Sequence, residues 1–293
     1  MNSIYSKSNR GKSFLSTQNI ILANLAWGII AVLYFLLFSA EIPTATGLQR
    51  PVWYRIGTYI FEIGAFLFAS YLCFKNWSSR NIVIGRFVWL TIGIGMLSYA
   101  LGDIFFGYHE IILKKEPIIS IGDIFFVITY LSVGLGMILT VVSRKINLEV
   151  WQWIIILSIG IVGSALAWVI FTINNQQPEG FAQLSPLLQQ MYYLVNWFYI
   201  VSDVLLVMIA TTVLFAFWGG KLAMSWRMIA IASFFLYIAD MWFKYAISNQ
   251  AYQSGHLLEV FWVLSALSFG MGAAFEYEAS LSRSRRERGR KRV

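Results

Sequence analysis

Residues 102–126 read GDIFFGYHEIILKKEPIISIGDIFF, so the pentapeptide GDIFF occurs twice within one short stretch. Each copy carries an aspartate, Asp103 or Asp123, inside apolar and aromatic sequence. A charged side chain costs about 2.5–3.5 kcal/mol at the centre of a membrane helix, so such an acid is expected to face a protein interior and to have a use there. The rest of the sequence indicates what role the two aspartates have.

The composition of the whole chain is typical of a membrane protein. Of the 293 residues, 58% are hydrophobic and only 12% are charged, whereas a soluble domain carries about 25% charged residues. Eight apolar runs are long enough to cross about 30 Å of hydrocarbon. We therefore predict an all-α integral membrane protein whose eight transmembrane helices lie at roughly 20–40, 57–74, 87–107, 121–142, 152–172, 192–217, 226–247 and 257–276.

Lysine and arginine predict the orientation of these spans. The N-terminal tail, the second, fourth and sixth connections, and the C-terminal tail are basic, while the alternate connections hold few basic residues. Cytoplasmic segments carry the excess of basic residues, so we expect both termini to be cytoplasmic. The predicted segments are a basic tail (1–19), two four-helix units (20–146 and 147–278) and a second basic tail (279–293).

The net charge of +8 lies mostly in these tails and loops. It predicts attraction to anionic lipid headgroups of the bilayer. The C-terminal tail SRSRRERGRKRV has no aromatic residue on which a base could stack, so we predict no nucleic-acid partner. Docking of a protein partner on this tail stays open.

The second half of the chain repeats the pattern of the first. Residues 238–245 (IADMWFKY) align with 101–108 (LGDIFFGY), and 259–272 (EVFWVLSALSFGMG) align with 123–136 (DIFFVITYLSVGLG). Four is an even number of crossings, so both units run through the membrane in the same direction. The sequence therefore predicts two parallel four-helix repeats.

The alignment pairs the acids of the two halves. Asp240 matches Asp103 and Glu259 matches Asp123, while a weaker match places Asp203 on Glu62. All lie toward the predicted extracytoplasmic ends of their helices, so we expect one acidic layer below that surface. The candidate ligand- or ion-binding residues are Glu62, Asp103, Asp123, Asp203, Asp240 and Glu259, with Tyr108, Tyr245, Tyr130, Phe106, Phe243 and Lys244 in support.

Capping is an alternative role for Asp123 and Glu259, because a carboxylate near a helix start accepts free backbone N–H groups and complements the helix dipole. Asp103 and Asp240 lie late in their helices, where a negative charge opposes the dipole. For these two acids the alternatives are a ligand, proton or ion site, or internal hydrogen bonds.

Several chemistries find no support in the sequence. It contains no HExxH, CxxC, P-loop or GxSxG pattern and only two histidines, so we predict no metal and name no cofactor. The single cysteine, Cys73, cannot form an internal disulfide. We do not expect an enzyme, although carboxylates alone could serve one acting on a lipid-linked substrate.

The stretch PIISIGDIFFVITYLSVGLGM, with Pro117, Ser120 and Asp123 following Asp103, resembles part of a known class of membrane regions. These are the multi-pass N-terminal regions of bacterial signalling proteins, including those with diguanylate-cyclase (GGDEF-type) output domains. The second half departs from the pattern, because it lacks the proline and carries Glu259. The resemblance implies a sensory module without its own output domain, which would signal through a cytoplasmic or membrane partner.

We therefore predict a multi-pass sensory or ligand-binding module of the cell membrane. The alternatives are a proton- or cation-coupled transporter and a structural subunit of a membrane complex. We expect the inner halves of the predicted spans to carry no acids, which weighs against a transporter. A homo-oligomer is compatible with the sequence.

Overall fold

The computed structural model describes residues 16–44, 47–79, 82–114, 119–143, 147–173, 181–219, 223–248 and 252–290. Eight helices in this part of the chain are long and apolar enough to cross a membrane, as predicted. They are α1 (Thr17–Phe38), α2 (Val52–Ser78), α3 (Arg86–Gly107), α4 (Ile121–Val142), α5 (Val150–Ile173), α6 (Pro186–Ala216), α7 (Ala223–Ser248) and α8 (Val260–Arg290).

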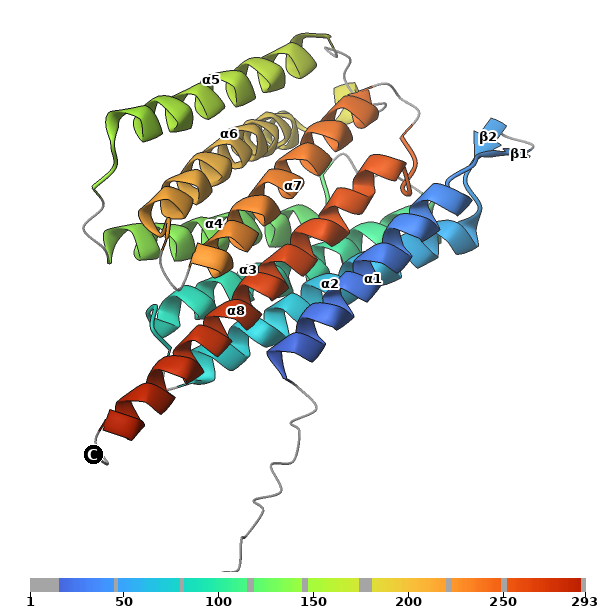
Figure 1. Ribbon diagram of the computed structural model, residues 1–293. Helices are drawn as coiled ribbons and strands as arrows, with labels where there is room; N and C mark the ends of the chain where they lie inside the picture. Colours follow the sequence, from blue (N-terminus) through green and yellow to red (C-terminus); the bar gives the residue numbers. More distant parts are fainter. Residues whose placement is uncertain are drawn as a thin grey trace, which may run out of the picture.

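The helices α3 and α8 form the centre of the bundle. Their apolar spans are 61% and 72% buried, against 17% for α5. Helix α3 packs between α2 and α4, and α8 packs against α7, α2 and α1. Helix α4 also contacts α6, while α5 lies at the edge against α6 and α7 (Figure 1).

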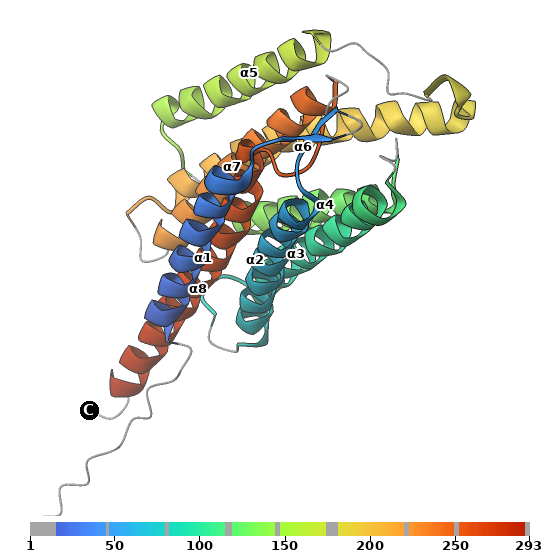
Figure 2. The same ribbon diagram turned by 90° about the vertical axis from the view of Figure 1, so that its right-hand side faces the viewer.

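The start of α1 and the end of α8 lie at the same end of the bundle (Figure 2). The even-numbered helices α2, α4, α6 and α8 begin at the other end, which we call the distal end. Both described termini therefore lie on one side, as an even number of crossings requires.

The ends of some helices differ from those that hydropathy predicts. Helix α8 continues to Arg290, so residues 279–290 of the expected C-terminal tail are helical. Helix α6 begins at Pro186, where the Ser185 hydroxyl accepts a hydrogen bond from the Leu188 N–H. A serine N-cap followed by proline starts a helix whatever the hydropathy of its first turn. Residues 1–15 and 291–293 of the predicted tails lie outside the described part.

Several short elements add to the predicted helices. Strands β1 (Ile42–Thr44) and β2 (Gly47–Gln49) form an antiparallel hairpin. A π-helical segment, η1 (Tyr108–Leu113), prolongs α3. Two 3₁₀ turns are η2 (Phe181–Gln183) and η3 (Leu257–Glu259), the second leading directly into α8.

The α3–α4 and α7–α8 interfaces use matching side chain–backbone hydrogen bonds. The Thr129 hydroxyl of α4 donates to the carbonyl of Gly95 in α3, at 3.0 Å. The Ser265 hydroxyl of α8 donates to the carbonyl of Ala232 in α7, at 2.8 Å. In the alignment of the two halves, continued upstream without a gap, Thr129 matches Ser265 and Gly95 matches Ala232.

Matching glycines bring the paired helices close together. A Cβ atom on Gly136 would lie 2.8 Å from Ile92 and 3.2 Å from the Val88 carbonyl oxygen. One on Gly272 would lie 2.9 Å from Ile229 and 3.1 Å from the Ser225 carbonyl oxygen. These contacts also correspond position by position, and the lack of a side chain at each glycine permits the close helix packing.

Candidate functional site

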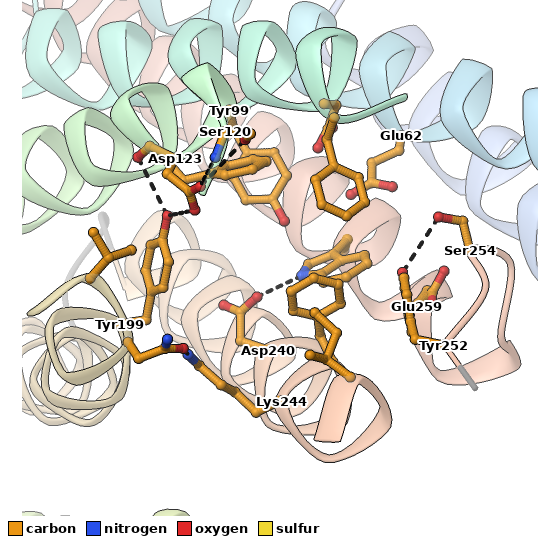
Figure 3. Close-up of a pocket in the computed structure, with 18 of the residues that line it drawn as sticks. Glu62, Tyr99, Ser120, Asp123, Tyr199, Asp240, Lys244, Tyr252, Ser254 and Glu259 are labelled. Atoms are coloured by element: carbon orange, nitrogen blue, oxygen red, sulfur yellow. Dashed lines mark hydrogen bonds between the residues drawn. The ribbon is translucent and has the colours of Figure 1, made fainter. Parts of the chain in front are cut away.

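A cavity of about 670 Å³ lies at the distal end of the bundle. All six candidate acids line it: Glu62 from α2, Asp103 from α3, Asp123 from α4, Asp203 from α6, Asp240 from α7 and Glu259 from η3. Figure 3 shows several of them converging on this space. Four of the predicted supporting residues also line it, namely Phe106, Tyr130, Phe243 and Lys244.

Asp203 and Asp240 share a tyrosine hydroxyl. The Tyr130 oxygen lies 2.5 Å from Oδ1 of Asp203 and 2.5 Å from Oδ2 of Asp240. The indole N–H of Trp262 donates to Oδ1 of Asp240 at 2.8 Å. One hydroxyl has one hydrogen to donate, so Tyr130 can donate to only one of the two carboxyl groups at a time.

Glu62 and Asp103 lie in different surroundings. They are 6% and 5% exposed. Within the described residues, Oδ2 of Asp103 is buried and has no hydrogen-bond partner. Phe126 packs against Gly102, the residue before Asp103, so closely that a Cβ atom there would lie 2.6 Å from the ring. A phenyl ring offers no donor, so Asp103 is left with an open acceptor.

Asp123 caps α4, which confirms that alternative for Asp123, whereas Glu259 accepts a hydrogen bond from a residue before η3. Oδ2 of Asp123 accepts a hydrogen bond from the Ser120 N–H at 2.7 Å, and Oδ1 accepts one from the Tyr199 hydroxyl at 2.9 Å. Oε2 of Glu259 accepts one from the Gly255 N–H at 2.6 Å. Both side chains nevertheless line the cavity, so these hydrogen bonds do not exclude a second role.

Two predicted supporting residues lie elsewhere. Tyr108 is 51% exposed and Tyr245 is 41% exposed, and neither lines the cavity. Tyr108 begins the π-helical segment, whose wider turn changes the direction of the residues after α3. Hydroxyl groups of Tyr130 and Tyr199 reach Asp203, Asp240 and Asp123 instead, and sequence reasoning missed Tyr199.

Glu110 is a buried acid that the sequence analysis also missed. Its carboxylate pairs with Arg55 at 2.9 Å and accepts hydrogen bonds from the Tyr59 hydroxyl at 2.6 Å and from Ser254. Position 110 lies beyond the predicted span 87–107, but the π-helical segment turns Glu110 inward, where its side chain is only 5% exposed. The signal available beforehand was an arginine, Arg55, beside an apolar span.

The segment before α8 is anchored at the rim of the cavity. Gly255 has a φ of +96°, a conformation that favours glycine. Its carbonyl accepts a hydrogen bond from the buried Tyr54 hydroxyl at 2.7 Å. The Arg50 guanidinium donates to the Gln253 carbonyl at 2.8 Å. These contacts hold Ser254 in place on the cavity wall.

Two titratable groups of this segment lie outside the spans. Burial raises the pKa of the Tyr252 hydroxyl well above its ordinary value. Burial, with a smaller effect of Arg50, lowers the pKa of His256. Nδ1 of His256 accepts a hydrogen bond from the Leu258 N–H at 3.2 Å, and its ring stacks on Trp242 with centroids 3.9 Å apart. Both features favour a neutral imidazole.

Apolar side chains close the bundle below the acids. Trp89, Ile92 and Met96 of α3 are at most 1% exposed, and Val263 of α8 is fully buried. One acid does lie at the inner end: Glu276 of α8 is fully buried and accepts a hydrogen bond from the Ile84 N–H at 3.2 Å. The prediction that the inner halves of the spans carry no acid is therefore wrong. Glu276 is buried there because its carboxylate binds the backbone of the α2–α3 connection.

The cavity chemistry is that of carboxylates among aromatic rings. No group of three or more His, Cys, Asp or Glu side chains in the described segments is placed to hold a metal ion. Tyr99, Phe126 and Trp262 are among the rings on the cavity wall. Acids and ring faces together attract a positively charged group.

We found no match to the chain among protein-family models, among curated proteins or among solved structures. The fold and the cavity by themselves define the class, which is a multi-pass α-helical membrane protein with an acid-lined cavity at one end of the bundle.

Proposed function

We propose that this protein is a sensory or ligand-binding module of the cell membrane. The observation that carries the proposal is the convergence of six acids, each from a different element, on one cavity. Buried carboxylate oxygens of Asp103, Asp203 and Glu259 have no hydrogen-bond partner among the described residues. Each such oxygen costs about 1–3 kcal/mol unless a donor arrives, so a bound ligand would recover this energy.

The proposal includes an orientation and an internal repeat. The distal end faces the extracytoplasmic side, and both termini are cytoplasmic, which the distribution of lysine and arginine supports. The units 20–146 and 147–278 are parallel repeats, which the corresponding contacts of α3–α4 and α7–α8 support.

The output passes through α8 to a cytoplasmic or membrane signalling partner. Helix α8 follows Glu259 at the cavity and runs to Arg290 at the opposite end (Figure 1). A ligand that changes the position of Glu259 would therefore act on one continuous helix. The resemblance to the membrane regions of bacterial signalling proteins favours the same reading.

Binding is favoured over transport by the depth of the cavity. Asp203 lies 13 residues before the inner end of α6 at Ala216, a distance of about 20 Å along a helix. Below it, Leu206, Ala210 and Val213 of the same helix are buried in the apolar core. In this conformation the acids serve a cavity, and no carboxylate-lined route continues inward from Asp203 along α6.

A cavity-filling substitution tests the binding function. Val195 of α6 lines the cavity, whereas Val201 of the same helix is 50% exposed on the outside. Val195→Trp should fill the site, and Val201→Trp makes the same chemical change away from it. The thermal midpoint of each protein in mild detergent is measured with inorganic cations, organic amines, neutral compounds and organic anions.

We expect at least one compound class to raise the midpoint of the wild type and of Val201→Trp in a concentration-dependent way. Val195→Trp should not respond. A response that persists unchanged in Val195→Trp, or no response of the wild type to any class, would contradict a binding function of this cavity.

Cysteine labelling tests the orientation. The native Cys73 is fully buried, so it provides a low background. An impermeant maleimide should label Leu48→Cys in intact cells and Ser282→Cys only after permeabilisation. The reverse pattern would place the cavity on the cytoplasmic side.

A further inference from the structure

The two halves carry the same pair of acids in unequal surroundings. The alignment matches Asp103 with Asp240, and more weakly Glu62 with Asp203. The second-half pair receives the Tyr130 hydroxyl, and Asp240 also receives the Trp262 indole N–H. At the positions that match Tyr130 and Trp262, the chain has Ala266 and Phe126. Neither of these side chains has a hydrogen-bond donor.

The first-half pair is therefore left without the donors that its counterpart has. Asp103 is 5% exposed, and its Oδ2 has no partner in the described part of the chain. Glu62 is 6% exposed and lines the same cavity. An open oxygen also remains on Asp203, but only the first-half pair lacks both donor side chains.

Aromatic rings surround this pair. Tyr99 lies one helical turn before Asp103 on α3, stacks on Phe66 with centroids 3.9 Å apart, and meets the Phe126 ring edge-on at 5.1 Å. Tyr99 and Phe126 both line the cavity. Ring faces attract a cation electrostatically, and the attraction is stronger where water is excluded.

We propose that Glu62 and Asp103 bind the ammonium group of a small primary amine. Its N–H groups supply the donors that Tyr130 and Trp262 give to the other pair, and its apolar part occupies the aromatic portion of the cavity. This proposal rests on the proposed binding function and names its ligand class. The cavity of about 670 Å³ has room for such a molecule.

The chemistry separates a primary amine from close relatives. A primary ammonium has three N–H donors, whereas a quaternary ammonium keeps the charge but has none. A neutral alcohol keeps a donor but lacks the charge. Of these three compound types, only the primary amine both donates hydrogen bonds to buried carboxylate oxygens and neutralises their charge.

The test uses three probes of one shape: phenethylamine, its N,N,N-trimethyl derivative and 2-phenylethanol. Thermal midpoints in mild detergent are measured against probe concentration for the wild type, Asp103→Asn, Glu62→Gln and the control Glu278→Gln, which changes an exposed glutamate. We expect phenethylamine to bind the wild type and the control at least 10-fold more tightly than the trimethyl derivative. The alcohol should have no effect, and Asp103→Asn and Glu62→Gln should each weaken the amine at least 10-fold.

Phe126→Trp provides a second variant that keeps every acid. It places an indole where the second half has Trp262, so it should supply a donor to Asp103 and weaken the amine response. Equal binding of the alcohol or of the trimethyl derivative, or an undiminished response in Asp103→Asn and Phe126→Trp, would overturn the proposal.

The two proposals fail in distinguishable ways. If amines have no effect but another class stabilises the wild type and not Val195→Trp, the binding function stands and the ligand class is wrong. If no class acts on the wild type, both proposals fall.

Discussion

The α3–α4 and α7–α8 pairs share several matching contacts but carry their acids in different surroundings. The hydrogen bonds of Thr129 and Ser265 and the close approaches at Gly136 and Gly272 correspond between the pairs. Around the acids, by contrast, a tryptophan in one half stands where the other has phenylalanine. Helix packing therefore corresponds at these positions in both halves, while the hydrogen-bond donors around the acids differ.

A second difference lies near the rim. The first half has the Arg55–Glu110 ion pair at 2.9 Å. In the second half Ile247 matches Glu110, so no acid stands there. Instead Lys244, which matches Gly107, donates a hydrogen bond to Asn196. The buried Arg55–Glu110 pair therefore has no counterpart at Ile247.

Removing that charge pair should have the largest effect. Glu110→Gln leaves the Arg55 guanidinium, 16% exposed, without its counter-ion. We expect the free energy of unfolding to fall by about 3 kcal/mol, measured by SDS titration in detergent micelles. Glu278→Gln should change it by less than about 0.5 kcal/mol. Equal effects of the two substitutions would show that the Arg55–Glu110 pair contributes nothing to stability.

Removing the shared hydroxyl should have the next largest effect. Tyr130→Phe withdraws the hydroxyl from two buried acids, and we expect a loss of about 2 kcal/mol. Tyr237→Phe is the matched control, because that hydroxyl donates to one neutral acceptor, the Gly163 carbonyl, at 2.8 Å. It should cost about 1 kcal/mol in the same titration. A smaller loss in Tyr130→Phe than in Tyr237→Phe would remove the distinction between the two acid pairs.

Exchanging the two aromatic residues tests whether the indole donor causes the difference between the two acid pairs. Trp262→Phe deprives Asp240 of its indole donor and leaves it only the hydroxyl of Tyr130 that it shares with Asp203, so we expect a loss of about 1.5 kcal/mol. Phe126→Trp makes the opposite change and should lower stability by less, or raise it. If both substitutions destabilise equally, ring size rather than hydrogen bonding governs these positions.

The corresponding glycines should behave alike. Gly136→Ala and Gly272→Ala each place a methyl group within 3 Å of an isoleucine side chain. We expect each to reduce the free energy of unfolding by about 1 kcal/mol, because overpacking outweighs the gain in helix propensity. A clear effect of only one of them would mean that the two interfaces are not equivalent.

The smallest effect concerns the residues that begin the last helix of each half. His256 caps η3, and the matching residue before α4 is Ser120, which does not titrate. Burial and Arg50 lower the pKa of His256, while Glu41 opposes them. The unfolded chain therefore binds this proton more readily, and stability falls as the pH drops through about 6.5.

His256→Ser isolates that contribution. The substitution should flatten the decline in the free energy of unfolding between about pH 7 and pH 5.5, by less than about 1 kcal/mol, in the same SDS titration. The difference between wild type and variant is the measured quantity, since the buried acids titrate in both proteins. Parallel curves would assign the whole pH dependence to those acids.

The membrane architecture and the identity of the cavity acids could be predicted from the sequence. Runs of about 20 apolar residues have few alternatives to a membrane helix. An acid such as Asp103 inside such a run must turn inward, because exposure to lipid is costly. The pairing of Asp103 with Asp240 was likewise visible in the alignment.

The hydrogen-bond partners of these acids depend on how the helices pack and could not be predicted from the sequence. Tyr130 on α4 reaches Asp203 on α6 across 73 positions of sequence, because α4 and α6 pack together. The π-helical segment turns Glu110 from an expected loop into the protein. Successive side chains on a helix point about 100° apart, and hydropathy does not predict which neighbour each side chain faces. The contrast between the two acid pairs therefore emerges only when the helices are packed.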